Sequence, residues 1–325
     1  MKKITQALLI ATLATTQWAS ADTFSERQAL LENNRKAGVK AIEVGYNPGT
    51  SVAKDQLFFW TNKYWPISNS MIEKTGYSIS FIPENDPVVL LNLVRAQHYK
   101  WLYVNPNIAV VAQEHGYTPV SYLNRSIESV FVVPTKSMTK TSDLKGKKIA
   151  TLGNTNESNF AKYYLHIENL QATFIDVGSG GYSELQALLE SKQVDAIAVS
   201  RTKAVEMVGA SNGELKILAS AGSAPLAVML VHTSVTQEQA EKINNSLLTL
   251  PLDALKGLPE LKFTAKEAIY LPFTKDHLRY TRAALGFVEP DYGRSIYDPK
   301  KDQYIESSQA FTEGVVLPIL AQPNP

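Results

Sequence analysis

The sequence predicts an α/β protein of two lobes, each with a mostly parallel sheet flanked by helices and joined by two crossing strands. Short apolar runs alternate with helix-spaced segments along the chain, as in α/β folds. Residues 130–133 and 227–231 are continuously apolar, as strands covered on both faces are. These two runs flank one compact block of strands and helices, so the chain is expected to enter the second lobe at the former and leave it at the latter.

Hydrophobic periodicity and helix-start residues predict the strands and helices that precede residue 130. The predicted strands are residues 41–46, 77–82 and 101–104. The predicted helices are residues 22–39, residues 58–74 with an interruption at Pro66, and two helices that begin at Pro87 and Pro106. Pro87 and Pro106 each follow an Asp or Asn, a combination that favours a helix start. Asn105 is therefore a fitting N-cap.

The block and the region after it repeat the alternation. The predicted strands are residues 148–152, 172–177, 194–199, 215–219 and 227–231. One helix is predicted directly after loop 153–158, and two more begin at Thr202 and just after Thr236. Three further helical segments are predicted at residues 182–191, 275–287 and 303–311. The 304 residues after residue 21 exceed what one hydrophobic core usually serves. The expected division is a signal peptide at 1–21, lobe 1 at 22–128 plus 225–325, and lobe 2 at 129–224.

The first residues predict export. Lys2 and Lys3 precede an apolar run at 4–13, and Ala19 and Ala21 supply small residues at a cleavage site. This is the pattern of a secretory signal peptide, with cleavage expected after Ala21. No later stretch reaches the about 20 apolar residues that a membrane span needs. No Cys follows to carry a lipid, so we expect a periplasmic protein without a membrane anchor.

Composition argues against several classes of function. The chain has no Cys, which removes disulfides, thiol catalysis and Cys-based metal sites. Without Lys2 and Lys3, the 32 Lys and Arg fall to 30 against 31 Asp and Glu, so a nucleic-acid partner is not expected. The five His residues show no metal-ligand spacing, and no hydrolase, P-loop or dinucleotide motif is present. We therefore expect no catalytic residue, no metal and no cofactor.

Loop 153–158 is the first candidate ligand site. It lies between a buried strand and a helix, so it presents backbone N–H groups at a helix N-terminus, which suit an anion. Two interpretations of Glu157 remain open. With Asn154 as N-cap, Glu157 at the third helical position completes a capping box. Alternatively, Glu157 faces a cationic or hydroxyl-bearing ligand.

Several segments resemble a known family. The run SDLKGKKIA at 142–150 resembles the "sLadLkGKkvA" segment of PhnD-type periplasmic binding proteins, the phosphate, phosphite and phosphonate branch of the PhnD/SsuA/transferrin-like type II solute-binding proteins of ABC transporters. Residues 99–106 with 115–120, and residues 185–195, are similar to further segments of that family in the same order. The resemblance covers roughly residues 41–207 and implies the type II periplasmic-binding-protein fold, with a ligand held between two hinged lobes.

The phosphate loop departs from the family pattern. The family's "DPxSTSG" falls on residues 153–159, where only Ser158 keeps the expected type and Asn156 and Glu157 replace Ser and Thr. A carboxylate there repels a phosphoryl oxygen unless one of the two is protonated. Arg201, just after strand 194–199, is a candidate anion-pairing group, although it also suits a solvated helix start.

Strand ends and the resemblance together give the candidate ligand contacts. They are Tyr46, Tyr103 and Asn105 from lobe 1, and Thr155, Asn156, Glu157, Ser158 and Arg201 from lobe 2. Tyr46 is equally suited to packing on Pro48 as a rim aromatic. Of these contacts, Asn156 and Ser158 are expected to bind ligand without being needed for folding.

The resemblance implies a monomeric solute-binding protein that captures a small polar ligand, such as a phosphate-like or phosphonate-like oxyanion, for an ABC importer. The closed, ligand-bound form would be recognised by a membrane permease. An alternative is a sensory module of the same fold that hands its closed form to a membrane sensor. A further alternative, less supported by the motifs, is an enzyme on this fold.

Overall fold

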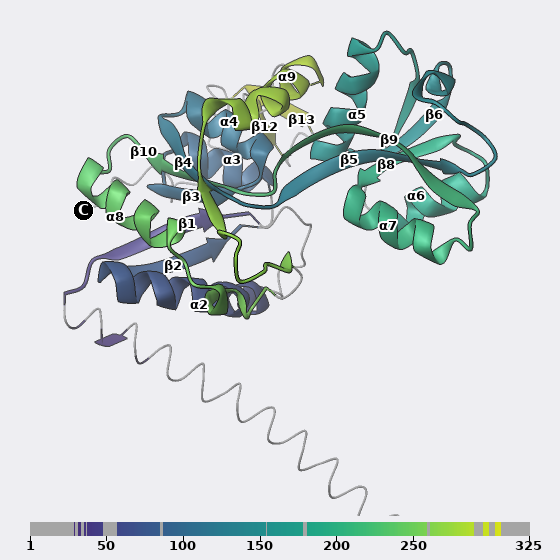
Figure 1. Ribbon diagram of the computed structural model, residues 1–325. Helices are drawn as coiled ribbons and strands as arrows, with labels where there is room; N and C mark the ends of the chain where they lie inside the picture. The colour runs from purple at the N-terminus through teal and green to yellow at the C-terminus, as the bar shows by residue number, and fades with distance from the viewer. Residues whose placement is uncertain are drawn as a thin grey trace, which may run out of the picture.

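The computed structural model describes residues 38–47, 57–84, 87–153, 155–177, 181–258, 261–288, 295–298 and 303–306, with the single positions 29, 32, 33 and 36. Figure 1 shows two bodies side by side, one around a six-stranded sheet and the other around a five-stranded sheet, with long strands running between them. Within these residues, no helix has the length and apolar character that a bilayer crossing requires. The expected signal peptide lies outside them.

The first sheet has the strand order β11-β4-β10-β3-β1-β2. Its strands are β1 (Ala41–Tyr46), β2 (Ser78–Pro83), β3 (Trp101–Val104), β4 (Tyr117–Leu123), β10 (Val228–His232) and β11 (Tyr270–Pro272). β1 pairs in parallel with β2 and β3, whereas β4 pairs antiparallel with β10 and β11, and β10 pairs antiparallel with β3. Parallel pairing therefore joins the strands that alternate with helices along the chain.

Helices cover both faces of this sheet. They are α2 (Leu57–Thr75) and α8 (Gln237–Leu248) on one face, and α3 (Pro87–Arg95), α4 (Pro106–Glu114) and α9 (Arg279–Val288) on the other. Because successive strand residues point to opposite faces, Trp101 and Tyr103 join the core under α2, and Leu102 and Val104 join the core under α4. The sheet is therefore the middle layer of three.

The second sheet has the order β7-β6-β8-β5-β9 and the same layering. Its strands are β5 (Ser126–Pro134), β6 (Lys148–Leu152), β7 (Thr173–Val177), β8 (Ala196–Ser200) and β9 (Leu215–Pro225). Its flanking helices are α5 (Asn156–Ile167) with η2 (Thr141–Leu144) on one face, and α6 (Gly181–Glu190) with α7 (Arg201–Ala210) on the other. Residues 130–133 are fully buried, which confirms the prediction of a strand covered on both faces.

Some predicted elements were wrong. Helix α2 runs unbroken through Pro66, because the helix is held by packing of Ile67 and Met71 into the core. Of the helix predicted at 303–311, residues Gln303–Glu306 form β13, paired with β12 (Ser295–Asp298), and residues 307–311 lie outside the described residues. Strand β4 was not predicted, and it contains Pro119, a residue that argues against a strand. The pairing of β4 with β10 shifts register between Met229 and Leu230. The described short helices η3 (Leu252–Leu255) and η5 (Lys275–Leu278) complete the set.

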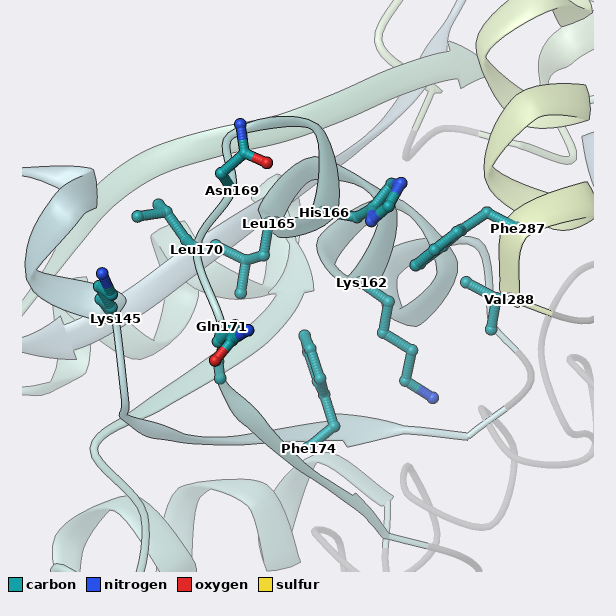
Figure 2. Close-up of a pocket in the computed structure, with 11 residues that line it drawn as sticks. Lys145, Lys162, Leu165, His166, Asn169, Leu170, Gln171, Phe174, Phe287 and Val288 are labelled. Atoms are coloured by element: carbon teal, nitrogen blue, oxygen red, sulfur yellow. The ribbon is translucent and has the colours of Figure 1, made fainter.

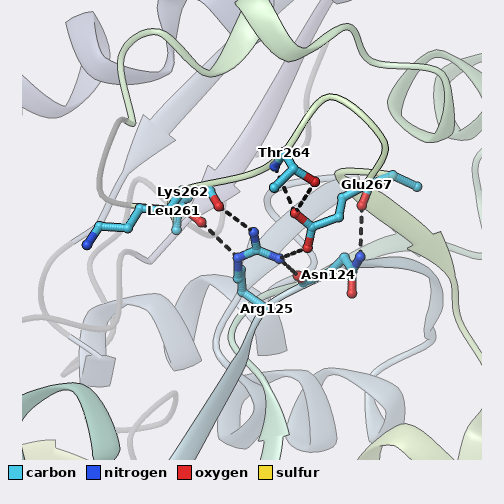
Figure 3. Close-up of polar contacts among 7 residues, drawn as sticks. Asn124, Arg125, Leu261, Lys262, Thr264 and Glu267 are labelled. Carbon is cyan, nitrogen blue, oxygen red and sulfur yellow. Dashed lines mark hydrogen bonds and ion pairs between the residues drawn. The ribbon is translucent and has the colours of Figure 1, made fainter. Parts of the chain in front are cut away.

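The chain crosses between the sheets twice, and one side chain holds the crossing. The Leu226 N–H, between β9 and β10, donates to the Arg125 carbonyl, between β4 and β5, at 2.8 Å. The Arg125 guanidinium donates to the carbonyls of Asn124, Leu261 and Lys262 at 2.7, 2.8 and 3.0 Å. Figure 3 shows it also bonded to Glu267, at 3.1 Å. Arg125 therefore ties the segment before β11 to the point where the chain changes sheet.

The Glu267 carboxylate completes this network and should make stability pH-dependent. Hydrogen bonds from the Thr264 N–H and hydroxyl, each 2.8 Å, and from Arg125 lower the pKa of Glu267 from 4.5 to about 2. A lowered folded-state pKa stabilises the fold above the ordinary pKa, and this contribution is lost as pH falls from 4.5 to about 2.

We expect Glu267→Gln to lower the free energy of unfolding at pH 7 and to remove this part of the acid sensitivity. Urea unfolding at pH 7, 4 and 2 measures both effects, since the difference from the unsubstituted protein should shrink toward pH 2. Glu214→Gln, at an exposed turn, is the control. Equal stability of Glu267→Gln and the unsubstituted protein at pH 7 would contradict the assignment.

Candidate functional site

The strand topology turns one end of each sheet toward the crossing. β3 is antiparallel to β10, which begins at the crossing, so the carboxyl ends of β3 and of its parallel neighbours β1 and β2 lie there. β8 is antiparallel to β5, which also begins at the crossing, so the carboxyl ends of β8, β6 and β7 lie there too. We call this region the junction. Carboxyl ends of strands are where open α/β sheets bind ligands.

Helix N-termini converge on the junction for the same reason. Among the described helices, α3, α4, α5, α6 and α7 each follow a strand whose carboxyl end lies there. The first turn of each helix has backbone N–H groups without an intrahelical partner and a partial positive charge. The junction therefore attracts negative charge from the backbone alone, and the side chains decide which ligand it accepts.

Asn105 acts as a helix cap. Its Oδ1 accepts the backbone N–H groups of Asn107 and Ile108 at 3.0 and 3.2 Å, which confirms the N-cap of α4. Its Nδ2 donates to Asn47 Oδ1 at 3.2 Å, and Asn47 Nδ2 donates to the Glu84 carbonyl at 2.8 Å. Asn105 thus shapes the edge formed by the ends of β1, β2 and β3, and a ligand contact by it stays a prediction.

Tyr46 and Tyr103 lie in the core directly behind this edge. They are paired in register on β1 and β3 and are only 1% and 2% exposed. Their ring centroids are 6.2 Å apart, and the Tyr64 ring of α2 packs against both. Burial, followed by the neighbouring Tyr270, raises the pKa of Tyr103 well above its ordinary value, so its phenol stays neutral. The predicted packing of Tyr46 on Pro48 falls outside the described residues.

On the other side of the junction, the N-cap of α5 is Thr155, and the predicted cap at Asn154 was wrong. The Thr155 hydroxyl accepts the Ser158 N–H at 3.2 Å and donates to the Leu152 carbonyl at 2.9 Å. Ser158 is therefore the third helical residue, and Glu157 is the second, so the capping box that the sequence suggested does not form. Both Thr and Asn are good caps, and the sequence alone did not separate them.

Two asparagines in the first turns of α5 carry buried atoms without a partner. Asn156 is 7% exposed and Asn159 1% exposed. Within the described structure, Asn156 Oδ1 and both amide atoms of Asn159 make no hydrogen bond. Asn107 Oδ1 in the first turn of α4 and Thr281 Oγ1 in α9 are in the same condition. Buried polar groups without a hydrogen-bond partner are uncommon in folded proteins, and an ordered water or a ligand is the usual partner at such a position.

These asparagines lie on the side of α5 that faces the first sheet. Asn156, Asn159, Phe160 and Tyr163 follow the spacing of one helix face. Phe160 and Tyr163 pack against Tyr280 of α9, with ring centroids 5.2 and 5.3 Å away. Helix α9 also packs on α4, and Figure 1 shows it between the two bodies. The amide groups of Asn156 and Asn159 are therefore at the junction rather than on the outside of the second sheet.

Glu157 is the buried carboxyl group of the site. It is 8% exposed, and burial raises the pKa of its carboxyl group, an effect that hydrogen bonding within the first turn of α5 partly offsets. The Ser129 hydroxyl on β5 donates to the Glu157 carbonyl at 2.9 Å, which ties this turn to the crossing strand. Tyr182 of α6 is close enough that the Glu157 charge adds to burial in raising the pKa of Tyr182 to about 12.

Ser158 serves the fold. Its side chain is fully buried, and its hydroxyl lies 3.0 Å from the Thr151 hydroxyl of β6. The Thr151 hydroxyl donates to the Asp176 carboxylate of β7, so the Ser158 hydroxyl donates to Thr151, and Asp176 pairs with Lys162 at 2.8 Å. These bonds, together with the positive charge of Lys162, outweigh burial and lower the pKa of Asp176. The network joins β6, β7 and α5 behind the junction.

Arg201 is already paired. Its Nη2 donates to Glu128 Oε1 at 2.8 Å, and its Nε bonds to the second carboxylate oxygen. The side chains of Arg201 and Glu128 are 48% and 24% exposed, so the pair adds at most about 1 kcal/mol to stability. The Arg201 guanidinium, which was predicted to pair with a ligand anion, therefore already pairs with Glu128 of β5.

Sequence reasoning missed Asn159, Asn107, Glu128, Tyr182 and Thr281. Asn159 was detectable, because it lies three residues after Asn156 on the same helix face. Glu128 and Arg201 are 73 residues apart, and only the pairing of β5 with β8 brings them together. No metal site adds to this set: among the described residues, no three His, Asp or Glu side chains are grouped to hold an ion.

A separate cavity of about 750 Å³ lies at the amino ends of β6 and β7, away from the junction. It is lined by Lys145, Lys162, Leu165, His166, Asn169, Leu170, Gln171, Ala172, Phe174, Phe287 and Val288. Figure 2 shows the His166 and Phe287 rings beside each other at one end and Lys145 at the other; the ring centroids are 4.1 Å apart. None of the eight predicted contacts lines it.

Comparison with known proteins gives one family and a consistent fold. Residues 60–268 match the family described as "ABC transporter, phosphonate, periplasmic substrate-binding protein". A search of curated proteins found no match. XAC2383 from Xanthomonas citri, solved with ATP, has a TM-score of 0.61 at 14% identity, covering 77% of this chain and 98% of that one.

Two further solved structures are similar. PhnD1 from Prochlorococcus marinus, in complex with methylphosphonate, has a TM-score of 0.55 at 13% identity, over 77% of this chain and 98% of its own. A binding protein component of an ABC phosphonate transporter from Pseudomonas aeruginosa has a TM-score of 0.53 at 12% identity, over 87% and 97%. At these identities the likeness concerns the fold, and it confirms the predicted type II periplasmic-binding-protein architecture.

The buried position of Ser158 changes what its substitution should do. We expect Ser158→Ala to lower the free energy of unfolding by about 1–3 kcal/mol, because the Thr151 hydroxyl loses a buried partner. Ser137→Ala is a matched control, since that exposed hydroxyl also donates to a carbonyl, Pro134, at 2.8 Å. Its effect should stay within about 0.5 kcal/mol. Urea unfolding decides, and equal effects of the two changes would show that Ser158 is not structural.

Proposed function

Because the chain belongs to the family of periplasmic phosphonate substrate-binding proteins of ABC transporters, we propose that it captures a small polar ligand bearing an oxyanion at the junction. The ligand would lie between lobe 1, residues 22–128 plus 225–325, and lobe 2, residues 129–224. It would then be delivered to an ABC permease from the periplasm. A protein of this family binds its ligand and leaves it chemically unchanged.

The observation that carries this proposal is the pair of buried, unpartnered asparagines at the start of α5. Each buried polar atom without a partner costs about 1–3 kcal/mol. Asn156 and Asn159 stand together at a helix N-terminus, where an anion is favoured, and beside the crossing strands. A ligand that bonds to these atoms would recover the cost, which is a physical reason for their presence in the free protein.

The arrangement of the two bodies supports capture by closure. The sheets are joined by two strands, and α9 packs on α5 of one body and on α4 of the other. A ligand touching both α5 and the edge near Asn105 would favour whichever arrangement brings them together. The proposed contacts on the α5 side are Thr155, Asn156, Glu157 and Asn159. Those on the other side belong to the edge behind which Tyr46 and Tyr103 lie.

The similar structures support an oxyanion as the recognised group. PhnD1 was solved with methylphosphonate and XAC2383 with ATP, and both ligands carry phosphoryl oxygens. The helix N-termini at the junction suit the same group without requiring a free cation. The ligand of this chain is therefore sought first among phosphate, phosphite and small phosphonates and sulfonates.

Substitution of the two asparagines should separate binding from stability. We expect Asn156→Ala and Asn159→Ala to weaken binding of the tightest oxyanion by about 10-fold or more, the value of one hydrogen bond to a charged group. Both should keep or raise the stability of the free protein, because an unpartnered buried amide is removed.

Calorimetry with phosphate, phosphite, methylphosphonate and methanesulfonate measures the affinities, and thermal unfolding measures the stability. Asn245→Ala, an exposed position on α8, is the control and should change neither. Unchanged affinity in both variants, at undiminished stability, would remove the start of α5 from the site.

A further inference from the structure

The cavity of about 750 Å³ away from the junction is shared by two helices that cover different sheets. Leu165 and His166 line it from the end of α5, and Phe287 and Val288 line it from the end of α9. We call it the α5–α9 cavity. Its volume lies within the range of about 300–1,000 Å³ that small-molecule sites occupy. A molecule held there would contact both bodies of the protein.

The way α5 ends gives this cavity an apolar wall. Asn169 has a left-handed φ of 54°, and its N–H donates to the His166 carbonyl at 3.0 Å. The Leu170 N–H donates to the Leu165 carbonyl at 2.8 Å. These two bonds form a Schellman motif, in which the residue after the left-handed position packs back on the last turn of the helix. Leu165 and Leu170 therefore share one apolar wall, and two of the last carbonyls of α5 already have a donor.

Aromatic rings supply the rest of the apolar lining. The rings of His166 and Phe287 are stacked, with centroids 4.1 Å apart and an interplanar angle of 22°. Phe174 of β7 adds another ring to the same cavity (Figure 2). Phe287 is 44% exposed, so a flat aromatic ligand laid against it would remove apolar surface from water.

The charged groups of the α5–α9 cavity are cationic. Lys145 and Lys162 line it, and among the described lining residues there is no Asp or Glu. Lys162 pairs with Asp176 at 2.8 Å, whereas the Lys145 ammonium makes no hydrogen bond or ion pair with a described residue. Gln171 adjoins Lys145, because the Gly146 N–H donates to the Gln171 carbonyl at 2.6 Å. An ammonium group beside an amide suits a carboxylate.

We propose that the α5–α9 cavity is a second binding site, which takes a small organic anion with an aromatic body. Figure 2 shows Lys145 at one end of the cavity and the His166 and Phe287 rings at the other. The anionic group would therefore lie at the Lys145 end, and the aromatic body would extend along Leu165 toward Phe287. This ligand differs in class from a phosphate-sized oxyanion, which has no apolar body to place against these rings.

Three probes test the two parts of this recognition separately. 2-Naphthoate carries both the charge and the aromatic body, 2-naphthamide carries the body without the charge, and acetate carries the charge without the body. Calorimetry on the full exported chain should give 2-naphthoate an affinity about 10-fold or more above that of either other probe, because only 2-naphthoate uses both ends of the cavity.

Substitutions locate the bound probe. Lys145→Gln and Phe287→Ala should each weaken 2-naphthoate binding by about 3-fold or more, because the first removes the ion pair and the second removes the ring contact. Lys256→Gln, at an exposed lysine of the other body, and Val205→Ala, at a 57% exposed side chain on α7, are the matched controls and should leave the affinity unchanged. Thermal unfolding checks that each variant is folded.

Three results would overturn the second site: no binding of 2-naphthoate, equal affinity for 2-naphthamide, or unchanged affinity for 2-naphthoate in the Lys145→Gln variant. The last of these is decisive even if Phe287→Ala loosens α9, because Lys145 is exposed in a turn. The outcome does not depend on oxyanion capture at the junction. Failure of phosphate and the phosphonates to bind would overturn the proposed function and leave this test unaffected.

Discussion

The antiparallel pairing of β5 with β9 is the constraint on which the rest of the molecule depends. Because both strands connect the two sheets, the pairing fixes which end of each sheet faces the crossing, and it is the carboxyl end in both cases. The pairing also fits α9 tightly. Gly222 on β9 has a φ of +136°, and a Cβ there would lie 2.2 Å from the Tyr280 ring of α9. Tyr280 donates to the Ala221 carbonyl at 2.6 Å, so the crossing, α9 and the start of α5 form one unit.

Periodicity and local capping signals were enough to predict the layered α/β fold, since residues 130–133 are apolar on both faces and Asn105-Pro106 starts α4 as expected. Pro66 and Pro119 misled the prediction, because tertiary packing tolerates a proline that a local rule treats as a break. Strand ends also predicted which segments meet at the junction. The roles of the residues within it were not predictable, because they depend on contacts between distant residues, such as the Glu128–Arg201 pair.

The candidate residues fall into two groups: those whose polar atoms already bond within the protein, and those whose polar atoms do not. Asn105 caps α4, Ser158 joins β6 to β7, and Arg201 pairs with Glu128, so their polar atoms are occupied before a ligand enters. Asn156 and Asn159 retain buried atoms that the described protein does not satisfy. A protein selected only for stability would replace them with apolar residues, since an unpartnered amide costs free energy without return. Buried polar atoms of this kind are a physical reason to place Asn156 and Asn159 in the proposed site, and a motif search does not register them.

The balance of charges at the junction affects which anions can bind there. Helix N-termini alone would suit any anion, and a fold of this family supplies several of them at one place. Two carboxylates of the chain reduce this positive potential. Glu157 lies in the first turn of α5, and Glu128 forms an ion pair with the Arg201 guanidinium. A carboxylate next to an oxyanion is tolerable only when a proton or another positive group lies between them.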